Sequence, residues 1–158
     1  MRRAFLIVGA LAVSAVVFCA RVEGVGAAPH ASVAPITDDA AINAILTRSC
    51  QDCHSDKTAW PWYSHIPPVG AAIRKDVAAG RAMMDLSRWN QYDGEQKNAA
   101  LAEIAALVRN GLMPPERYTF LHPGARLSAG DIQRLTQWTI AERRRLRAAS
   151  ESTQAKNQ

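Results

Sequence analysis

The residues best suited to chemistry in this chain lie together, in the segment Cys50-Gln51-Asp52-Cys53-His54. Two thiols separated by two residues and followed at once by an imidazole are the pattern of covalent c-type haem attachment. Each thiol can add across one haem vinyl group, and the two-residue gap lets one turn of backbone reach both vinyls. The next residue then lies beneath the macrocycle, where its imidazole can take an axial position on the iron. We therefore predict Cys50 and Cys53 as the tethers of one haem c and His54 as the proximal iron ligand.

Three other interpretations of this segment compete with haem attachment: a redox dithiol, a zinc site and a disulfide. A thioredoxin-type dithiol would need a preceding strand in a βαβ unit, and the sequence indicates none. A zinc site needs four ligands, whereas the remaining histidines, His30, His65 and His122, are single and scattered. A disulfide between Cys50 and Cys53 would leave His54 without a role. Haem attachment is the interpretation that uses all three side chains.

A second axial ligand is predicted in the loop Gly111-Leu112-Met113-Pro114-Pro115. A thioether binds iron weakly, so its loop must hold the sulfur in place, and two prolines reduce the freedom of that loop. Met113 is therefore the predicted sixth ligand, and the alternative is a methionine that fills core space. The rivals are the histidines of two other turns, His65 and His122, with Met83 and Met84 ranked lower because they lie on a predicted helix.

An aromatic, proline-rich run from residue 60 to 68 follows the haem motif. Its prolines disfavour a helix and predict an extended backbone. Trp60, Trp62 and Tyr63 are predicted to pack on the haem edge, where indole and phenol hydrogens can reach propionates or backbone carbonyls; ordinary core packing carries equal weight. One proline of this run is also expected to offer its carbonyl to the outer ring nitrogen of His54.

Helical periodicity predicts the elements that position these side chains. Thr37 is expected to cap a first helix that ends near Ser49 and leads into the haem motif. Further helices are predicted over 69–84, 94–109 and 128–149, and Gly80 weakens the prediction for 69–84. No strand and no internal repeat is indicated. The expected fold is all-α: a small cytochrome c-like domain of about four helices wrapped around one covalently bound haem.

The ends of the chain differ in composition from this domain. Arg2 and Arg3 precede a run without charge over residues 4–20, followed by small residues. This pattern predicts a signal peptide over 1–27, with an uncleaved N-terminal membrane anchor as the alternative. The predicted organisation continues with a linker over 28–36, the haem-binding domain over 37–149 and a polar, disordered tail over 150–158. Cys19 does not suit a lipoprotein site, because bulky residues precede it.

The net charge of the chain is +5, and loss of residues 1–27 removes three arginines and one glutamate, which leaves +3. Such a mild balance gives no reason to expect nucleic-acid binding. Most of the basic bias lies in a late arginine run, residues 143–147, which is typical of the solvated end of a helix. The sharper alternative is a docking patch for an acidic redox partner or an anionic membrane surface.

These residues together resemble the small haem-binding domain family of bacterial proteins, a relative of cytochrome c. The likeness covers about residues 40–140 and rests on an ordered set of motifs: Cys50 to Ser55, Trp60-Pro61-Trp62-Tyr63-Ser64, Ser87-Arg88-Trp89, Gly111 to Pro115, Tyr118, His122-Pro123, and Leu127-Ser128 before a helix with Trp138. Family members often carry bulky aromatics where this chain has Gly70, Ala71 and Ala72. The resemblance implies haem binding and leaves the physiological reaction open.

The expected function is an exported, periplasmic monohaem c-type cytochrome that carries single electrons. With His54 and Met113 both on the iron, no site is open for substrate, so the chain is not expected to be an enzyme. The expected partners are redox proteins and the haem-attachment machinery, with membrane association through the N-terminus as the anchored alternative, facing the periplasm from the inner membrane. The alternative function is a peroxidase-like haem enzyme or a gas or redox sensor with an open or displaceable distal site, with His65, Arg74 or Arg88 as a distal polar group.

Overall fold

A computed structural model of the chain describes residues 32–156, which belong to a unit spanning Ala31–Gln158. The predicted signal peptide or anchor over 1–27, the first four residues of the predicted linker and residues 157–158 lie outside the described residues. The described part contains six α-helices and three short 3₁₀ helices, and no strand occurs within it. The prediction of an all-α domain is confirmed.

The longer α-helices are α2 (Ala40–Ser49), α4 (Val69–Met83), α5 (Gly94–Arg109) and α7 (Ala129–Lys156), and the short ones are α3 (Gln51–His54) and α6 (Glu116–Leu121). The 3₁₀ helices are η1 (Trp62–His65), η2 (Leu86–Gln91) and η3 (Pro123–Ala125). The four predicted helices correspond to α2, α4, α5 and α7. Neither α6 nor the 3₁₀ helices were predicted, because elements of one or two turns carry too few residues to show a period.

Helix α5 begins and ends where its local sequence dictates. The Asp93 side chain accepts a hydrogen bond from the Gln96 backbone, and the Gln96 side chain bonds back to the Asp93 backbone, forming a capping box. At the other end Gly111 has a φ of 67°, a conformation that suits glycine and ends the helix. The bounds 94–109 were therefore predicted correctly.

Helix α2 begins two residues later than predicted. Asp39, not Thr37, is its N-cap, since the Asp39 carboxylate accepts hydrogen bonds from the backbone of Ala41 and Ile42. The Thr37 hydroxyl accepts one from the Asp39 backbone and so precedes the helix. The preceding segment is tied to the domain as well, because the Val33 backbone donates to the Gln51 side chain at 3.0 Å.

The prediction that the proline-rich run is extended was wrong for part of it, because residues 62–65 form the 3₁₀ helix η1. Its prolines stand at the borders of a short helix, with Pro61 as the N-cap of η1 and the other two after Ile66. Residues 62–65 are therefore free to form a 3₁₀ turn, in which the Ser64 backbone donates to the Pro61 carbonyl. A proline ahead of the first turn does not oppose a helix, so these prolines leave residues 62–65 able to form one.

Helix α7 extends to Lys156 and so includes residues 150–156 of the segment predicted as a disordered tail. Three hydroxyls there bond back to carbonyls three or four residues earlier: Ser150 to Arg147, and Ser152 and Thr153 to Ala149. The side chains of this last part are exposed. Each added helical residue gains a backbone bond at little cost, so the helix continues past the region where it is packed.

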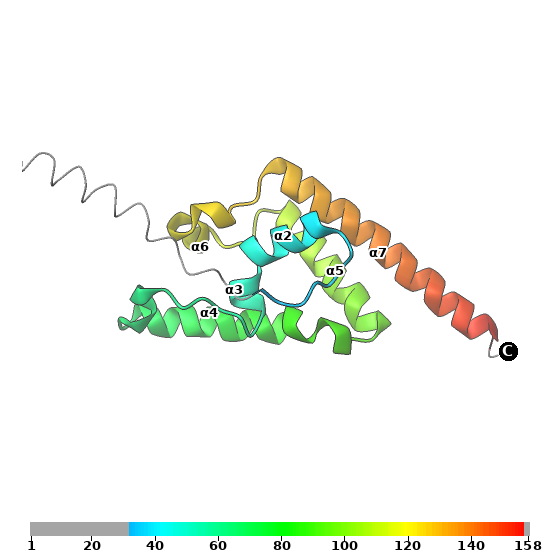
Figure 1. Ribbon diagram of the computed structural model, residues 1–158, viewed down its shortest axis with the longest axis horizontal. Helices are drawn as coiled ribbons and strands as arrows, with labels where there is room; N and C mark the ends of the chain where they lie inside the picture. The colour runs from blue at the N-terminus through cyan, green and yellow to red at the C-terminus, as the bar shows by residue number, and fades with distance from the viewer. Residues whose placement is uncertain (1–31, 157–158) are drawn as a thin grey trace, which may run out of the picture. The chain divides into compact units, whose positions relative to one another are not determined.

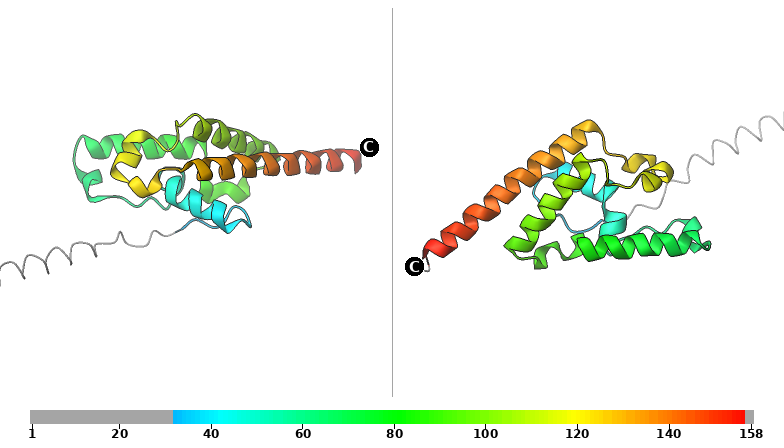
Figure 2. Two further views of the ribbon diagram at one scale, coloured as in Figure 1. Left: turned by 90° about the horizontal axis from the view of Figure 1, so that it is seen from above. Right: turned by 180° about the vertical axis from the view of Figure 1, so that it is seen from behind.

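The core lies where α2, α5 and α7 meet η2. It is formed by buried apolar residues of these elements and of Met84: Ile42, Ile45, Leu46, Met84, Leu86, Trp89, Leu101, Ile104, Val108 and Leu135. Figures 1 and 2 show α5 and α7 side by side and running in opposite directions, while α3 lies between α2 and α4. Within the described residues no helix is both long and apolar enough to cross a membrane.

Candidate functional site

The haem motif forms the corner between two helices. Cys50 ends α2, and the other motif residues make up the single turn α3, in which the backbone N–H groups of Cys53 and His54 both bond to the Cys50 carbonyl, at 3.2 and 3.0 Å. Residues three apart on such a turn lie on one face. The turn therefore presents both thiols to the same side.

The ring of His54 is oriented by the end of α4. Its Nδ1 atom lies 3.0 Å from the carbonyl oxygen of Met84. A carbonyl only accepts hydrogen bonds, so Nδ1 donates, and in the neutral ring this leaves on Nε2 the lone pair that a metal-binding histidine uses. The expectation that a proline of the 60–68 run supplies this carbonyl was wrong. Met84 is extended, with φ of −156° and ψ of 127°, and so turns its carbonyl out of the helical ladder.

A glycine allows α4 to pack directly on the motif. A Cβ atom placed on Gly80 would lie 2.6 Å from the Cys53 carbonyl oxygen. Gly80 is buried inside α4 without interrupting it. Gly80, which weakens the helix prediction from sequence, is thus the residue that lets α4 pack against α3. Arg81 strengthens the same contact, since its Nε donates to the Ser55 carbonyl at 2.7 Å.

A cavity of about 180 Å³ opens beside the motif. Cys50, Cys53, His54 and Met113 all line it, although Met113 comes from the loop after α5. The tertiary structure thus brings together the four residues predicted as tethers and ligands. Met83 lines this cavity too and is exposed, whereas Met84 belongs to the core.

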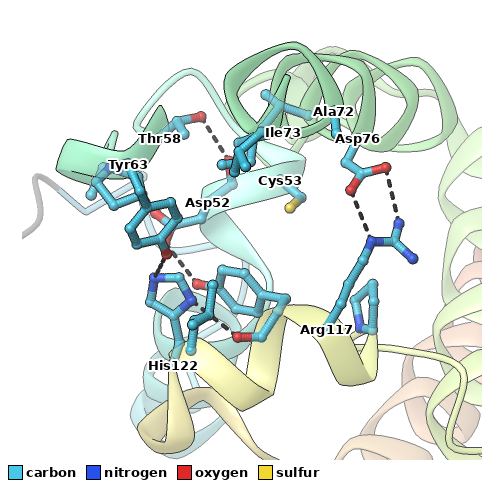
Figure 3. Close-up of a pocket in the computed structure, with 16 residues that line it drawn as sticks. Asp52, Cys53, Thr58, Tyr63, Ala72, Ile73, Asp76, Arg117 and His122 are labelled. Carbon is cyan, nitrogen blue, oxygen red and sulfur yellow. Dashed lines mark hydrogen bonds and ion pairs between the residues drawn. The ribbon is translucent and has the colours of Figure 1, made fainter. Parts of the chain in front are cut away.

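A second cavity of about 240 Å³ lies next to the first and shares Cys53 with it. Its wall is mainly apolar, with Val69, Ile73, Val77 and Leu121 among the residues that form it. In Figure 3 the Cys53 sulfur lies between the Asp76–Arg117 ion pair on one side and the pair formed by Tyr63 and His122 on the other. Both spaces are lined largely by apolar surface and share the Cys53 thiol, which suits a site for an apolar ligand.

The two thiols are in surroundings that keep them protonated. Burial, with a smaller contribution from the neighbouring Cys53, raises the pKa of Cys50 to about 12. Burial and the nearby Asp52 also raise the pKa of Cys53. Both cysteines are free in the structure. A redox-active dithiol needs a lowered pKa at one sulfur, so these surroundings disfavour the thioredoxin-type alternative.

Helix α6 is fixed to the haem motif through a tyrosine. The Tyr118 hydroxyl donates to Asp52 Oδ2 at 2.7 Å, and burial followed by this bond raises the pKa of Tyr118. Arg117 of the same helix makes two hydrogen bonds to Asp76 of α4, at 2.9 and 3.1 Å. α6 therefore closes one side of both cavities, which Arg117 and Tyr118 line.

Of the rival histidine ligands, His122 lines the second cavity together with Cys53, and neither His122 nor His65 lines the cavity that the four predicted haem residues share. His122 has both ring nitrogens engaged: Nδ1 lies 3.1 Å from the Tyr118 carbonyl, and Nε2 lies 3.1 Å from the Tyr63 hydroxyl. Because the carbonyl can only accept, Nδ1 donates and Nε2 accepts from Tyr63. His65 is exposed in η1 and lines neither cavity. Arg74 and Arg88 also line neither.

Of the three aromatic residues predicted to cover a haem edge, the structure places one at a cavity and two away from both cavities. Tyr63 lines the second cavity. Trp60 and Trp62 line neither cavity, and Trp62 is 76% exposed with its ring edge-on to Tyr63. Their role as haem contacts stays a prediction.

Sequence reasoning missed Ser49, Asp52, Asp76 and Arg117 as residues of the site. These are common surface types, and neither spacing nor composition distinguishes them from solvated residues. Tyr118 entered only as part of the family motif. Its partner, Asp52, lies inside the haem motif and offered the one available signal, a carboxylate beside a tether.

The domain is all-helical, and two thiols, a histidine whose Nδ1 bonds a carbonyl, and a methionine line one of its cavities, an arrangement that suits a haem-binding protein. The family model described as "Haem-binding domain" matches residues 11–141. The chain belongs to this family, and the resemblance seen in its motifs is confirmed. No curated protein and no solved structure matches the chain.

Proposed function

We propose that this haem-binding protein is an exported monohaem c-type cytochrome that transfers single electrons. Cys50 and Cys53 hold the haem through thioether bonds, His54 is the proximal ligand and Met113 the sixth. The observation that carries the proposal is the hydrogen bond from His54 Nδ1 to the Met84 carbonyl, in a cavity that the other three residues also line.

The proposed attachment reaction, addition of a thiol to a vinyl group, needs no oxidant. Each thiol adds its sulfur to one carbon of a vinyl group and its hydrogen to the other, so one C–S bond forms and one C=C bond is lost. Protonated thiols, as burial favours here, carry the hydrogen that the product needs. When bound, the haem supplies an iron that cycles between two oxidation states.

The ligand set supports electron transfer over substrate chemistry. The Met84 carbonyl holds the imidazole with Nε2 free to bind iron. Met113 would supply the second ligand to the iron, and a thioether ligand favours the reduced state and raises the reduction potential. Six-coordinate iron leaves no position for a substrate. The residues of the chain then orient the ligands and exclude water from the iron.

The proposed location is the periplasm, because covalent attachment of this kind takes place after export and residues 1–27 read as an export signal. Partners in this proposal are the haem-attachment machinery and soluble or membrane-bound redox proteins. An uncleaved N-terminus would anchor the domain to the inner membrane with the same orientation.

The direct test is expression of the full chain with haem-attachment machinery, followed by a denaturing gel stained for haem and by mass spectrometry. The expected result is one haem mass per chain that survives denaturation. Cys50→Ala with Cys53→Ala should lose the stain, whereas the exposed-residue control Ser87→Ala should keep it. A colourless wild-type protein would overturn the proposal.

A further inference from the structure

One buried hydroxyl beside the haem motif has no hydrogen-bond partner in the part of the chain that the structure describes. Ser49, the last residue of α2, is only 6% exposed, and no group of the described residues bonds to its Oγ atom. A serine inside a helix commonly bonds back to the carbonyl four residues earlier, and Ser49 does not. Because a buried unpaired hydroxyl is unfavourable, such a group in a native protein calls for an explanation.

Ser49 lines the cavity that Cys50, Cys53, His54 and Met113 share. The other polar side chains of that cavity have partners. Asp76 pairs with Arg117, Tyr118 donates to Asp52, and His54 Nδ1 bonds the Met84 carbonyl. Among the described residues, Ser49 therefore carries a polar side-chain group of this cavity that has no partner, and four sulfur-bearing side chains line the same cavity: Cys50, Cys53, Met83 and Met113.

The proposed function leaves one of these sulfurs in need of orientation. In the proposed function the bonds to the macrocycle fix the two tether sulfurs, and Met83 is 57% exposed. Met113 is half-buried on a loop and must present one lone pair to iron. A thioether sulfur has a second lone pair and accepts weak hydrogen bonds.

We propose that the Ser49 hydroxyl donates a hydrogen bond to Met113 Sδ when that sulfur ligates the iron. Ser49 is then a positioning residue that fixes the second lone pair of the sulfur. The inference rests on the proposed function. Donation draws electron density from the sulfur and so from ferric iron, which favours the reduced state.

The test uses haem-loaded full-length protein and compares Ser49→Ala with wild type. We expect a lower midpoint potential and a displaced long-wavelength sulfur-to-iron band in the ferric spectrum. Haem content on the denaturing gel should be unchanged. The band is the decisive readout, because a merely structural hydroxyl, or one bonded to a propionate, would leave its position unaltered.

Ser64→Ala is the matched control. The Ser64 hydroxyl is also buried and unpartnered among the described residues, yet it lines neither cavity. An unchanged band in Ser49→Ala, or an equal displacement in both variants, overturns the inference and leaves the proposed function intact. A wild-type protein with covalent haem but no such band contradicts Met113 as ligand and overturns both.

Discussion

Gly80 and Cys53 belong to different helices, and the Cys53 carbonyl oxygen lies 2.6 Å from the place where a side chain on Gly80 would begin. Because that oxygen is backbone, it cannot move without moving α3 and both predicted tethers. Gly80→Ala should therefore lower stability by about 1–3 kcal/mol, as overpacking of a close contact does.

The Gly80 prediction is checked by thermal unfolding of the haem-loaded protein and by haem per chain, both of which should fall. Gly94→Ala is the control, since nothing lies within 4 Å of a Cβ there. That variant should match wild type or exceed it. A Gly80→Ala protein with unchanged melting temperature would show that α3 and α4 can separate without loss.

Met113→Ala should remove the long-wavelength sulfur-to-iron band and turn the ferric spectrum toward high spin. The reason is that the loop after α5 would no longer offer a thioether to the sixth position. Met83→Ala is the matched control, because Met83 lines the same cavity from α4. Loss of the band in the Met83 variant alone would exchange the two assignments. A high-spin wild-type protein would favour the enzyme or sensor alternative.

Tyr118→Phe should destabilise the domain by about 1.5–3 kcal/mol, the range for a hydrogen bond to a charged group. The lost bond joins α6 to Asp52 at 2.7 Å. Tyr63→Phe should cost less, since the Tyr63 hydroxyl bonds a ring nitrogen at 3.1 Å. Denaturant unfolding of Tyr118→Phe, Asp52→Asn and the double variant measures the coupling. Additive losses would contradict a direct Tyr118–Asp52 interaction.

The hydrogen bonds of Asp131, in the first turn of α7, lead us to predict that the stability of the domain depends on pH. Hydrogen bonds from the Ser128 backbone and hydroxyl hold the pKa of Asp131 below its ordinary value of 3.8. A pKa lowered by folding stabilises the domain above the unfolded value, and this stabilisation is lost as pH falls through the folded value. Asp131→Asn keeps an acceptor but removes the charge, and should therefore cost about 0.3–1 kcal/mol near neutral pH, the range for a carboxylate near a helix N-terminus.

The Asp131 difference is measured as the free energy of unfolding against pH. It should shrink below about pH 4 and vanish once wild-type Asp131 is protonated. Glu151→Gln, at an exposed position near the end of α7, should track wild type throughout. A difference that persists undiminished in acid would assign the effect to shape and not to charge.

The sequence by itself determined the features that depend on neighbours along the chain. The spacing of Cys50, Cys53 and His54 pointed to haem, and the family comparison confirms haem binding. The bounds of α5 followed from Asp93, Gln96 and Gly111, because caps act within a few residues. The all-helical class followed from apolar periods that only an amphipathic helix explains.

Only the tertiary structure decided which distant groups complete the site. The carbonyl that orients His54 comes from Met84, thirty positions away, and no local pattern marks a backbone carbonyl as an acceptor. The Tyr118 hydroxyl that bonds Asp52 comes from α6, and Ser49 of α2 lines one cavity with Met113 of the loop after α5. Hydrogen bonds and cavities between helices depend on how those helices pack, and packing is a property of the whole domain.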